Sequence, residues 1–138
     1  MLKSAWKRWA LLALLVMLAS YWLLIFVATH LPVQKLPHTG VSNDKLQHLV
    51  AYAGLTFLLT IVWRLARNFR WREVPLMLLV PATYGVLDEL TQSLVGRTTD
   101  LKDWVADCMG AVIGLVAGLL VYAMLRMLFK PHLKTSLD

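Results

Sequence analysis

The 138-residue sequence has little charge and only one cysteine, Cys108. A single cysteine excludes an intramolecular disulfide and any zinc site built from several thiolates. Charged residues make up 16% of the chain, whereas hydrophobic residues make up 59%, and the mean hydropathy is +0.62. A soluble domain of this length cannot bury so many apolar side chains, and they are gathered in runs of membrane-spanning length. The sequence therefore predicts an integral membrane protein.

Acidic residues are also scarce, since eight acids stand against 14 bases and the formal net charge is +6. In a soluble protein this excess of basic residues would suggest that the protein binds nucleic acid. Here the bases lie in the short connections between apolar runs, which is the pattern that sets membrane topology. Membrane lipids are therefore the expected partners, and nucleic acid is not.

The apolar runs predict an all-α membrane protein in which residues 1–138 form a single domain, a bundle of four transmembrane helices at about 9–29, 44–63, 73–95 and 101–128. The first run follows a basic start, as a signal peptide does, but it is longer than the 7–15 apolar residues of a signal peptide. We expect it to be retained. Pro81 is expected to kink the third helix and Gly96 to end it.

The fourth run carries glycines at a spacing of four residues, Gly110, Gly114 and Gly118. Small residues at this spacing allow two membrane helices to approach closely. The pattern therefore predicts that the fourth helix packs tightly against a neighbour.

The distribution of charge predicts that both termini are cytoplasmic. Ten bases fall on one side of the expected bundle: Lys3, Lys7, Arg8, Arg64, Arg67, Arg70, Arg72, Arg126, Lys130 and Lys134. Four fall on the other: Lys35, Lys45, Arg97 and Lys102. With two acids on the first side and six on the second, the inner side carries +8 and the outer side −2. The extracytoplasmic end should therefore be acidic.

Polar residues from three helices are expected to meet near this outer end. A rise of about 1.5 Å per residue, counted from the basic residue at each inner end, puts His48, Asp88 and Asp107 at roughly 24, 24 and 28 Å in a hydrocarbon layer of about 30 Å. Residues three or four apart share a helix face. The faces are Asp44, His48 and Tyr52; Tyr84, Asp88 and Gln92; and Asp103, Asp107 and Gly110. They predict one shallow acidic cavity.

Intramembrane acids are costly and usually have a function. The candidates for acid or base catalysis are His48, Asp88, Glu89 and Asp107, and those for binding are Asp44, Lys45, Tyr52, Tyr84, Gln92, Arg97 and Asp103. Arg97 is the cation best placed to bridge carboxylates. Asp44, Asp100 and Asp103 can equally be helix caps or partners of helix dipoles. His30, His38 and His132 are expected to be ordinary loop or tail residues.

No cofactor and no metal site are expected. Carboxylates with one histidine can bind a divalent cation, so such an ion stays a less favoured alternative. The sequence has no HExxH or comparable compact ligand motif. A metal-free site is favoured.

Two segments resemble the VanZ-like family of small bacterial membrane proteins: DKLQHLVAYAGLTFLL at 44–59 and YGVLDELTQSLVGRTTDLKDWVADCMGAVIG at 84–114. The resemblance implies a four-helix protein of the bacterial cytoplasmic membrane, and its motif positions are largely the candidates named above, with Gly110 added. The family is named for a protein linked to low-level teicoplanin resistance. Two features depart from the pattern: Asp107 stands where many members have asparagine, and the Gly96-Arg97 turn lacks a preceding proline.

Three functions stay open at this point. The first is a cell-envelope protein whose acidic outer cavity binds a lipid head group, a lipid-linked cell-wall precursor or a glycopeptide such as teicoplanin. The second is an enzyme acting on a lipid-linked envelope substrate. The third is a structural module in which the polar cluster only locks the helices together. Neither catalysis nor the oligomeric state is decided by the sequence.

Overall fold

The computed structural model describes residues 2–31, 44–67, 70–96 and 99–129. Four α-helices make up most of this part of the chain: α1 (Leu2–His30), α2 (Asp44–Ala66), α3 (Val74–Gln92) and α4 (Leu101–Phe129). Short 3-10 turns, η2 (Trp71–Glu73) and η3 (Ser93–Val95), extend α3 at its two ends. Among the described residues, four helical spans are long and apolar enough to cross a membrane, which confirms the all-helical, four-span architecture.

The helix boundaries follow local chemistry. α1 and α2 run further than expected, to Leu2 and to Ala66, because no proline or glycine interrupts the polar residues at those ends. The third span is regular only from Val74 to Gln92, and it continues through Pro81. Gly96 ends that span in the left-handed conformation, with φ 79°, as a glycine at this position is expected to do.

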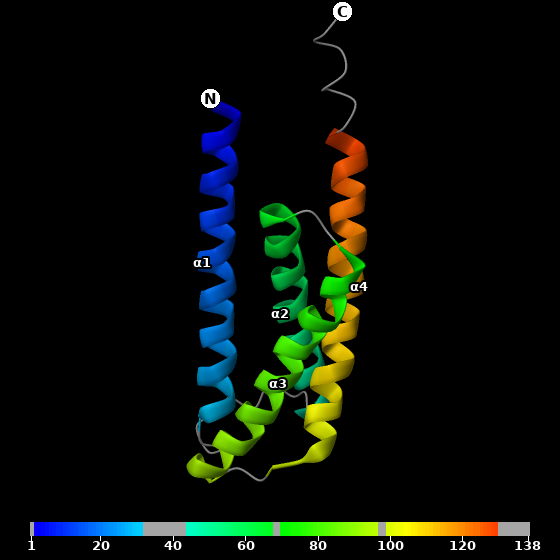
Figure 1. The fold of residues 1–138 in the computed structure, drawn as a ribbon. Coiled ribbons are helices and arrows are strands. Elements are labelled where there is room, and N and C mark those ends of the chain that lie inside the picture. The colour runs from blue at the N-terminus through cyan, green and yellow to red at the C-terminus, as the bar shows by residue number, and fades with distance from the viewer. Residues whose placement is uncertain (1, 32–43, 68–69, 97–98, 130–138) are drawn as a thin grey trace, which may run out of the picture.

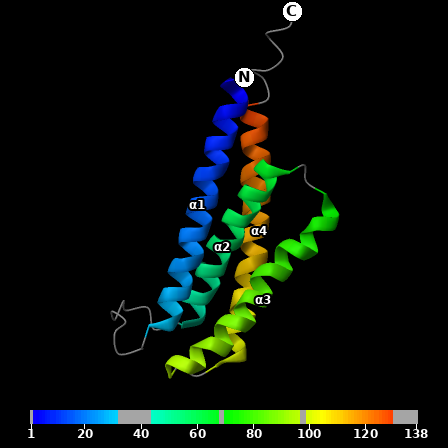
Figure 2. The same ribbon diagram turned by 60° about the vertical axis from the view of Figure 1, so that its left-hand side comes forward.

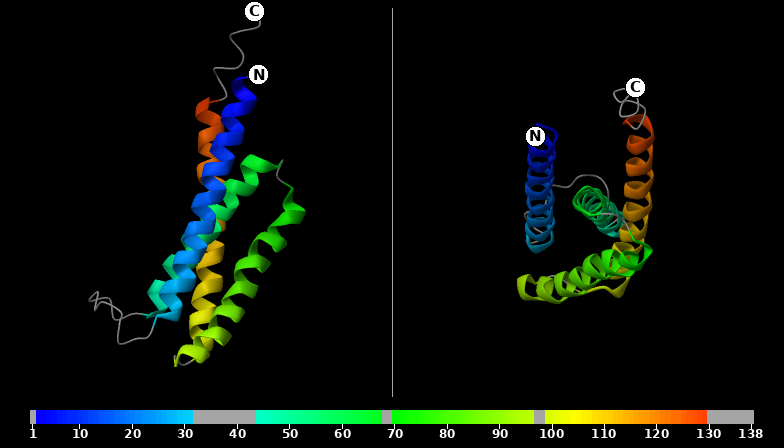
Figure 3. Two further views of the ribbon diagram at one scale, coloured as in Figure 1. Left: turned by 90° about the vertical axis from the view of Figure 1, so that its left-hand side faces the viewer. Right: turned by 45° about the horizontal axis from the view of Figure 1, so that its top comes forward.

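α2 forms the centre of the bundle. It lies between α1 and α4, and α3 runs across the other helices (Figure 3). The most extensive packing is between α2 and α4. α3 is oblique, so it diverges from the bundle at its η2 end and approaches α4 at its η3 end (Figure 2). The beginning of α1 and the end of α4 lie at the same end of the molecule (Figure 1).

Glycines let α4 approach the backbone of α2. A Cβ atom on Gly110 would collide with the carbonyl oxygen of Leu49, and one on Gly114 would collide with that of Ala53. Gly118 lies against Thr60 in the same way, with only 2.8 Å between its would-be Cβ and that of Thr60. The predicted close packing of the fourth helix is therefore confirmed, and α2 is its neighbour.

α1 packs against α2 through a smaller apolar contact. Leu18 and Ile25 of α1 join Tyr52 and Leu55 of α2 in one buried cluster. Tyr21 also donates a hydrogen bond from its hydroxyl to the carbonyl of Ala51, at 3.2 Å. Much of the outward surface of all four helices is apolar, as a lipid-facing surface should be.

We predict that Gly114→Val separates α2 from α4. The new side chain meets backbone rather than a flexible side chain, so the overpacking cannot be relieved locally, and we expect a loss of roughly 1–3 kcal/mol or more. Thermal unfolding in detergent measures the effect. Ala123→Val adds similar bulk at an exposed position of α4 and should leave the midpoint nearly unchanged. Equal midpoints for both variants would contradict the packing described here.

Candidate functional site

α1 and η3 end, and α2 and α4 begin, at one end of the bundle (Figures 1 and 2). The polar side chains of the candidate site come from these helix ends. The buried members are His48, Asp88, Glu89, Gln92, Asp103 and Asp107. This placement follows from the sequence, because these six residues all lie near this end of their apolar runs. The structure thus brings together described candidates from α2, α3 and α4.

The central contact joins α2 to α4. The Nδ1 atom of His48 lies 3.0 Å from Oδ1 of Asp107, and Asp107 is fully buried. With the carboxylate ionised and the imidazole neutral, Nδ1 donates the hydrogen bond and Nε2 is left as the acceptor nitrogen. Oδ2 of Asp107 is buried without a hydrogen-bond partner among the described residues. It packs over Gly85, where a Cβ atom would come within 2.9 Å of it.

Asp88 joins α3 to α1, a contact that the sequence did not reveal. Its carboxylate accepts hydrogen bonds from Gln92 Nε2 at 2.9 Å and from Thr29 Oγ1 at 2.8 Å. His30 lies beside it, with Nδ1 3.8 Å from Asp88 Oδ1 and Nε2 2.9 Å from Thr91 Oγ1. The expectation that His30 is an ordinary loop residue was wrong, because α1 continues through it and its last turn packs against α3.

Asp100 and Asp103 are held by one cation. Lys45 Nζ lies 3.2 Å from a carboxylate oxygen of each. Asp100 also caps α4, since its Oδ1 accepts the Lys102 N–H at 2.9 Å. The hydrogen bond from the Lys102 N–H does most to hold the pKa of Asp100 below its usual value, and the Lys45 ammonium makes the next largest contribution. The expected capping role of Asp100 is confirmed.

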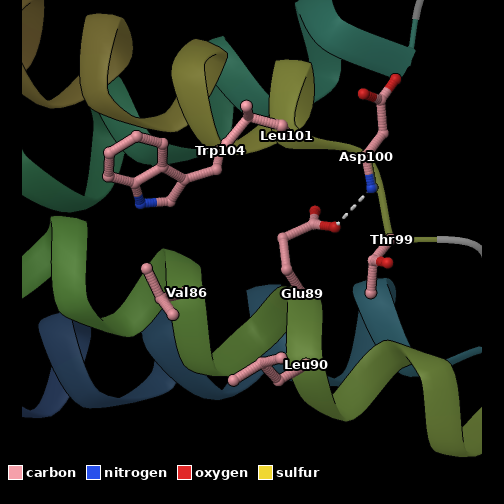
Figure 4. A pocket seen from close by; sticks show the side chains of 7 residues that line it. All are labelled: Val86, Glu89, Leu90, Thr99, Asp100, Leu101 and Trp104. Carbon is pink, nitrogen blue, oxygen red and sulfur yellow. Dashed lines mark hydrogen bonds between the residues drawn. The ribbon is translucent and has the colours of Figure 1, made fainter.

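Glu89 faces α4 from α3, whereas its neighbour Asp88 faces α1. Glu89 Oε2 accepts the backbone N–H of Asp100 at 3.1 Å, and Oε1 is buried without a partner among the described residues (Figure 4). The side chain lines a pocket of about 380 Å³, together with Val86, Leu90, Thr99, Asp100, Leu101 and Trp104. Trp104 is fixed by its own hydrogen bond, from Nε1 to Ala82 O at 3.0 Å.

Two tyrosines, Tyr52 and Tyr84, lie among the buried polar residues. The rings of Tyr52 and Tyr84 are stacked with centroids 5.9 Å apart, and Trp22 of α1 meets Tyr84 edge-on at 5.1 Å. Both hydroxyl groups are buried without a hydrogen-bond partner in the described part of the chain. The two tyrosines lie among the candidate residues.

A second pocket of about 230 Å³ lies between α1 and α2. Its walls are apolar, from Leu24, Ile25, Ala28 and Ala51, and polar groups are added by Tyr21, Thr29, Asp44, Gln47, His48 and Tyr52. Asp88 and Asp107 line neither this pocket nor the one beside Glu89. The sequence predicted a single shared cavity, whereas the structure places buried carboxylates and aromatic rings between two pockets.

A divalent cation has one potential set of ligands among the described residues. A ring nitrogen of His48 and carboxylate oxygens of Asp44 and Asp103 lie within 4.8 Å of one another. Lys45 already pairs with Asp103, which weakens the attraction of this set for a cation. The metal-free site therefore stays our prediction.

Several sequence-based assignments fall outside the described residues. Arg97, expected to bridge carboxylates, is one of them, and so are His38 and His132. Thr29 and His30 were not predicted to belong to the site. One feature could have indicated them, because both are polar and end an apolar run at the same depth as the acids.

Comparison with known proteins identifies one family. A family model described as VanZ/LLP1 matches residues 2–126, which is most of the chain. Searches of curated proteins and of solved structures gave no match.

The lowered pKa of Asp100 predicts that the stability of the folded protein depends on pH. Because its pKa is lower in the folded protein than in the unfolded chain, its contribution is complete above the unfolded value of about 3.9 and is lost as the pH falls through the folded value. The difference in unfolding midpoint between wild type and Asp100→Asn should therefore be present at neutral pH and shrink as the pH falls below about 4. A difference that stays constant or grows on acidification would contradict this assignment.

Proposed function

Because this chain belongs to the VanZ-like family, we propose that it is a multi-pass membrane protein of the bacterial cell envelope that binds the polar part of an amphiphilic molecule. The pocket between α1 and α2 carries the proposal. Its apolar wall can hold an acyl or aromatic group, while Asp44, His48 and Thr29 can hydrogen-bond a polar head. A lipid head group, a lipid-linked cell-wall precursor and a lipophilic glycopeptide such as teicoplanin all have this two-part character.

The proposed orientation places this end outside the cytoplasmic membrane, with both termini inside. Basic residues support it at the opposite end: Arg64 and Arg126 lie in the last turns of α2 and α4, Arg67 follows α2, and Arg72 precedes α3. An excess of arginine and lysine marks the cytoplasmic side. In this orientation the pocket is available to lipids and to drugs that reach the outer leaflet.

A second candidate is catalysis on a lipid-linked envelope substrate. The observation that favours it is the His48–Asp107 pair, in which a buried carboxylate orients an imidazole whose residue also lines the pocket. An imidazole held in this way can act as a general base through Nε2. Asp88 and Glu89 are less suited to that role, since Asp88 already accepts two hydrogen bonds from side chains and Glu89 faces the other pocket.

A purely structural module is the remaining alternative, because Lys45 and His48 each tie α2 to α4. In that case every effect of a substitution should follow protein stability. A ligand site instead requires variants that fold normally and lose the function.

We expect expression in a susceptible bacterial host to raise tolerance to teicoplanin and to change tolerance to vancomycin little. His48→Gln should remove most of that gain, because it alters the pocket wall and leaves Asp107 without its ionisable partner. Minimum inhibitory concentrations at equal protein levels measure the effect. The matched control is Glu73→Gln, at the opposite end of α3, where Glu73 accepts a hydrogen bond from Trp63.

Three outcomes distinguish the resistance role, the enzyme and the structural module. Unchanged susceptibility with wild-type protein contradicts the resistance role. An altered envelope lipid or precursor, detected by mass spectrometry and dependent on His48, favours the enzyme. Loss of tolerance only in proportion to a lowered unfolding midpoint favours the structural module.

A further inference from the structure

The pocket beside Glu89 contains a carboxylate oxygen that the described protein leaves unpaired. Glu89 is 7% exposed, and Oε1 is among the buried polar atoms without a hydrogen-bond partner. Its other oxygen is occupied by the Asp100 N–H. Figure 4 shows the side chain rising from α3 between Leu90 and the Asp100–Trp104 segment, so the carboxylate stands inside the pocket. A buried acid in this state favours a ligand that supplies a donor.

The walls restrict the kind of ligand. Val86, Leu90 and Leu101 are apolar and largely exposed, so in a membrane they face lipid, and Trp104 adds an aromatic surface. Asp100 also lines the pocket, but its backbone N–H faces Glu89 while its carboxylate points away and pairs with Lys45, so Glu89 supplies the negative charge (Figure 4). The ligand should therefore combine an apolar body with a cationic donor group. An indole beside such a group adds a favourable interaction when the cation lies over its ring.

We propose that this pocket binds the primary ammonium head group of a membrane aminophospholipid, with the ammonium donating to Glu89 Oε1. An ammonium carries three donors and a full positive charge, which meets the need of a carboxylate in a low-dielectric setting. The acyl chains lie along the exposed apolar surface of α3 and α4. Both helices have their ends here, so the site lies at the level where lipid head groups occur.

This site is separate from the pocket between α1 and α2. Its lining residues come from α3, α4 and the segment before α4, and none of them lines the other pocket. The proposal therefore does not depend on a glycopeptide or a precursor binding elsewhere. Failure of the resistance assay would leave it intact, and failure of lipid selectivity would leave the resistance assay intact.

Native mass spectrometry of the detergent-purified full chain tests the proposal with two lipids of identical acyl chains, phosphatidylethanolamine and phosphatidylglycerol. Wild-type protein should retain phosphatidylethanolamine preferentially. Glu89→Gln keeps the shape of the side chain and removes its charge, so it should weaken this binding by about tenfold or more. Glu89→Asp, which keeps the charge, should retain part of the preference. Glu73→Gln makes the same chemical change in η2, at the other end of α3, and should match wild type.

Thermal unfolding in lipid-free detergent shows whether each variant is folded. Equal retention of both lipids by wild type, or an unchanged preference in a folded Glu89→Gln protein, would overturn the proposal. Saturation by soluble phosphoethanolamine at the same concentration would overturn the assignment to a lipid. Arg97→Gln tests whether the chain supplies its own cation: if only that variant prefers phosphatidylethanolamine, Glu89 is the partner of Arg97 and the lipid site is rejected.

Discussion

The cost of burying carboxylates away from water governs this end of the molecule. An unpaired charge in the membrane is unfavourable, so each buried acid should find a donor or a cation. Asp107 pairs with His48, and this contact sets α4 against α2 next to the place where the glycines of α4 meet the backbone of α2. The close helix packing and the polar pairing therefore support each other. A shift of either helix by one residue would misplace both.

The same requirement explains how the remaining helices join. Asp88 is satisfied by Thr29 and Gln92, so the end of α1 is held against α3 by polar contacts as well as by the Trp22–Tyr84 contact. Lys45 connects the start of α2 with Asp100 and Asp103. Pairing is nevertheless incomplete, because Glu89 and Asp107 each keep one buried oxygen without a partner among the described residues. A polar cluster that only locked the helices together would not need these unpaired carboxylate oxygens.

Much of this arrangement is accessible from the sequence, and the failures have physical causes. Apolar run length gave the four spans, and spacing by three or four residues correctly put Asp88 with Gln92. Helix depth put His48 and Asp107 at one level, and the structure shows them in contact. Thr29 and His30 were missed because the end of an apolar run does not reveal whether the helix continues. Glu89 illustrates a different limit. Adjacent helical residues point about 100° apart, so Asp88 and Glu89 face different helices, and only three-dimensional packing shows which.

His48 and Asp107 form one interacting pair on which the geometry of the site depends. A double-mutant cycle with His48→Gln and Asp107→Asn, read as free energy of unfolding in detergent, measures the interaction directly. We expect each single substitution to be destabilising and the two together to cost less than their sum, with a coupling of about 1 kcal/mol or more. Strictly additive effects would contradict it, because the two residues would then stabilise the bundle independently.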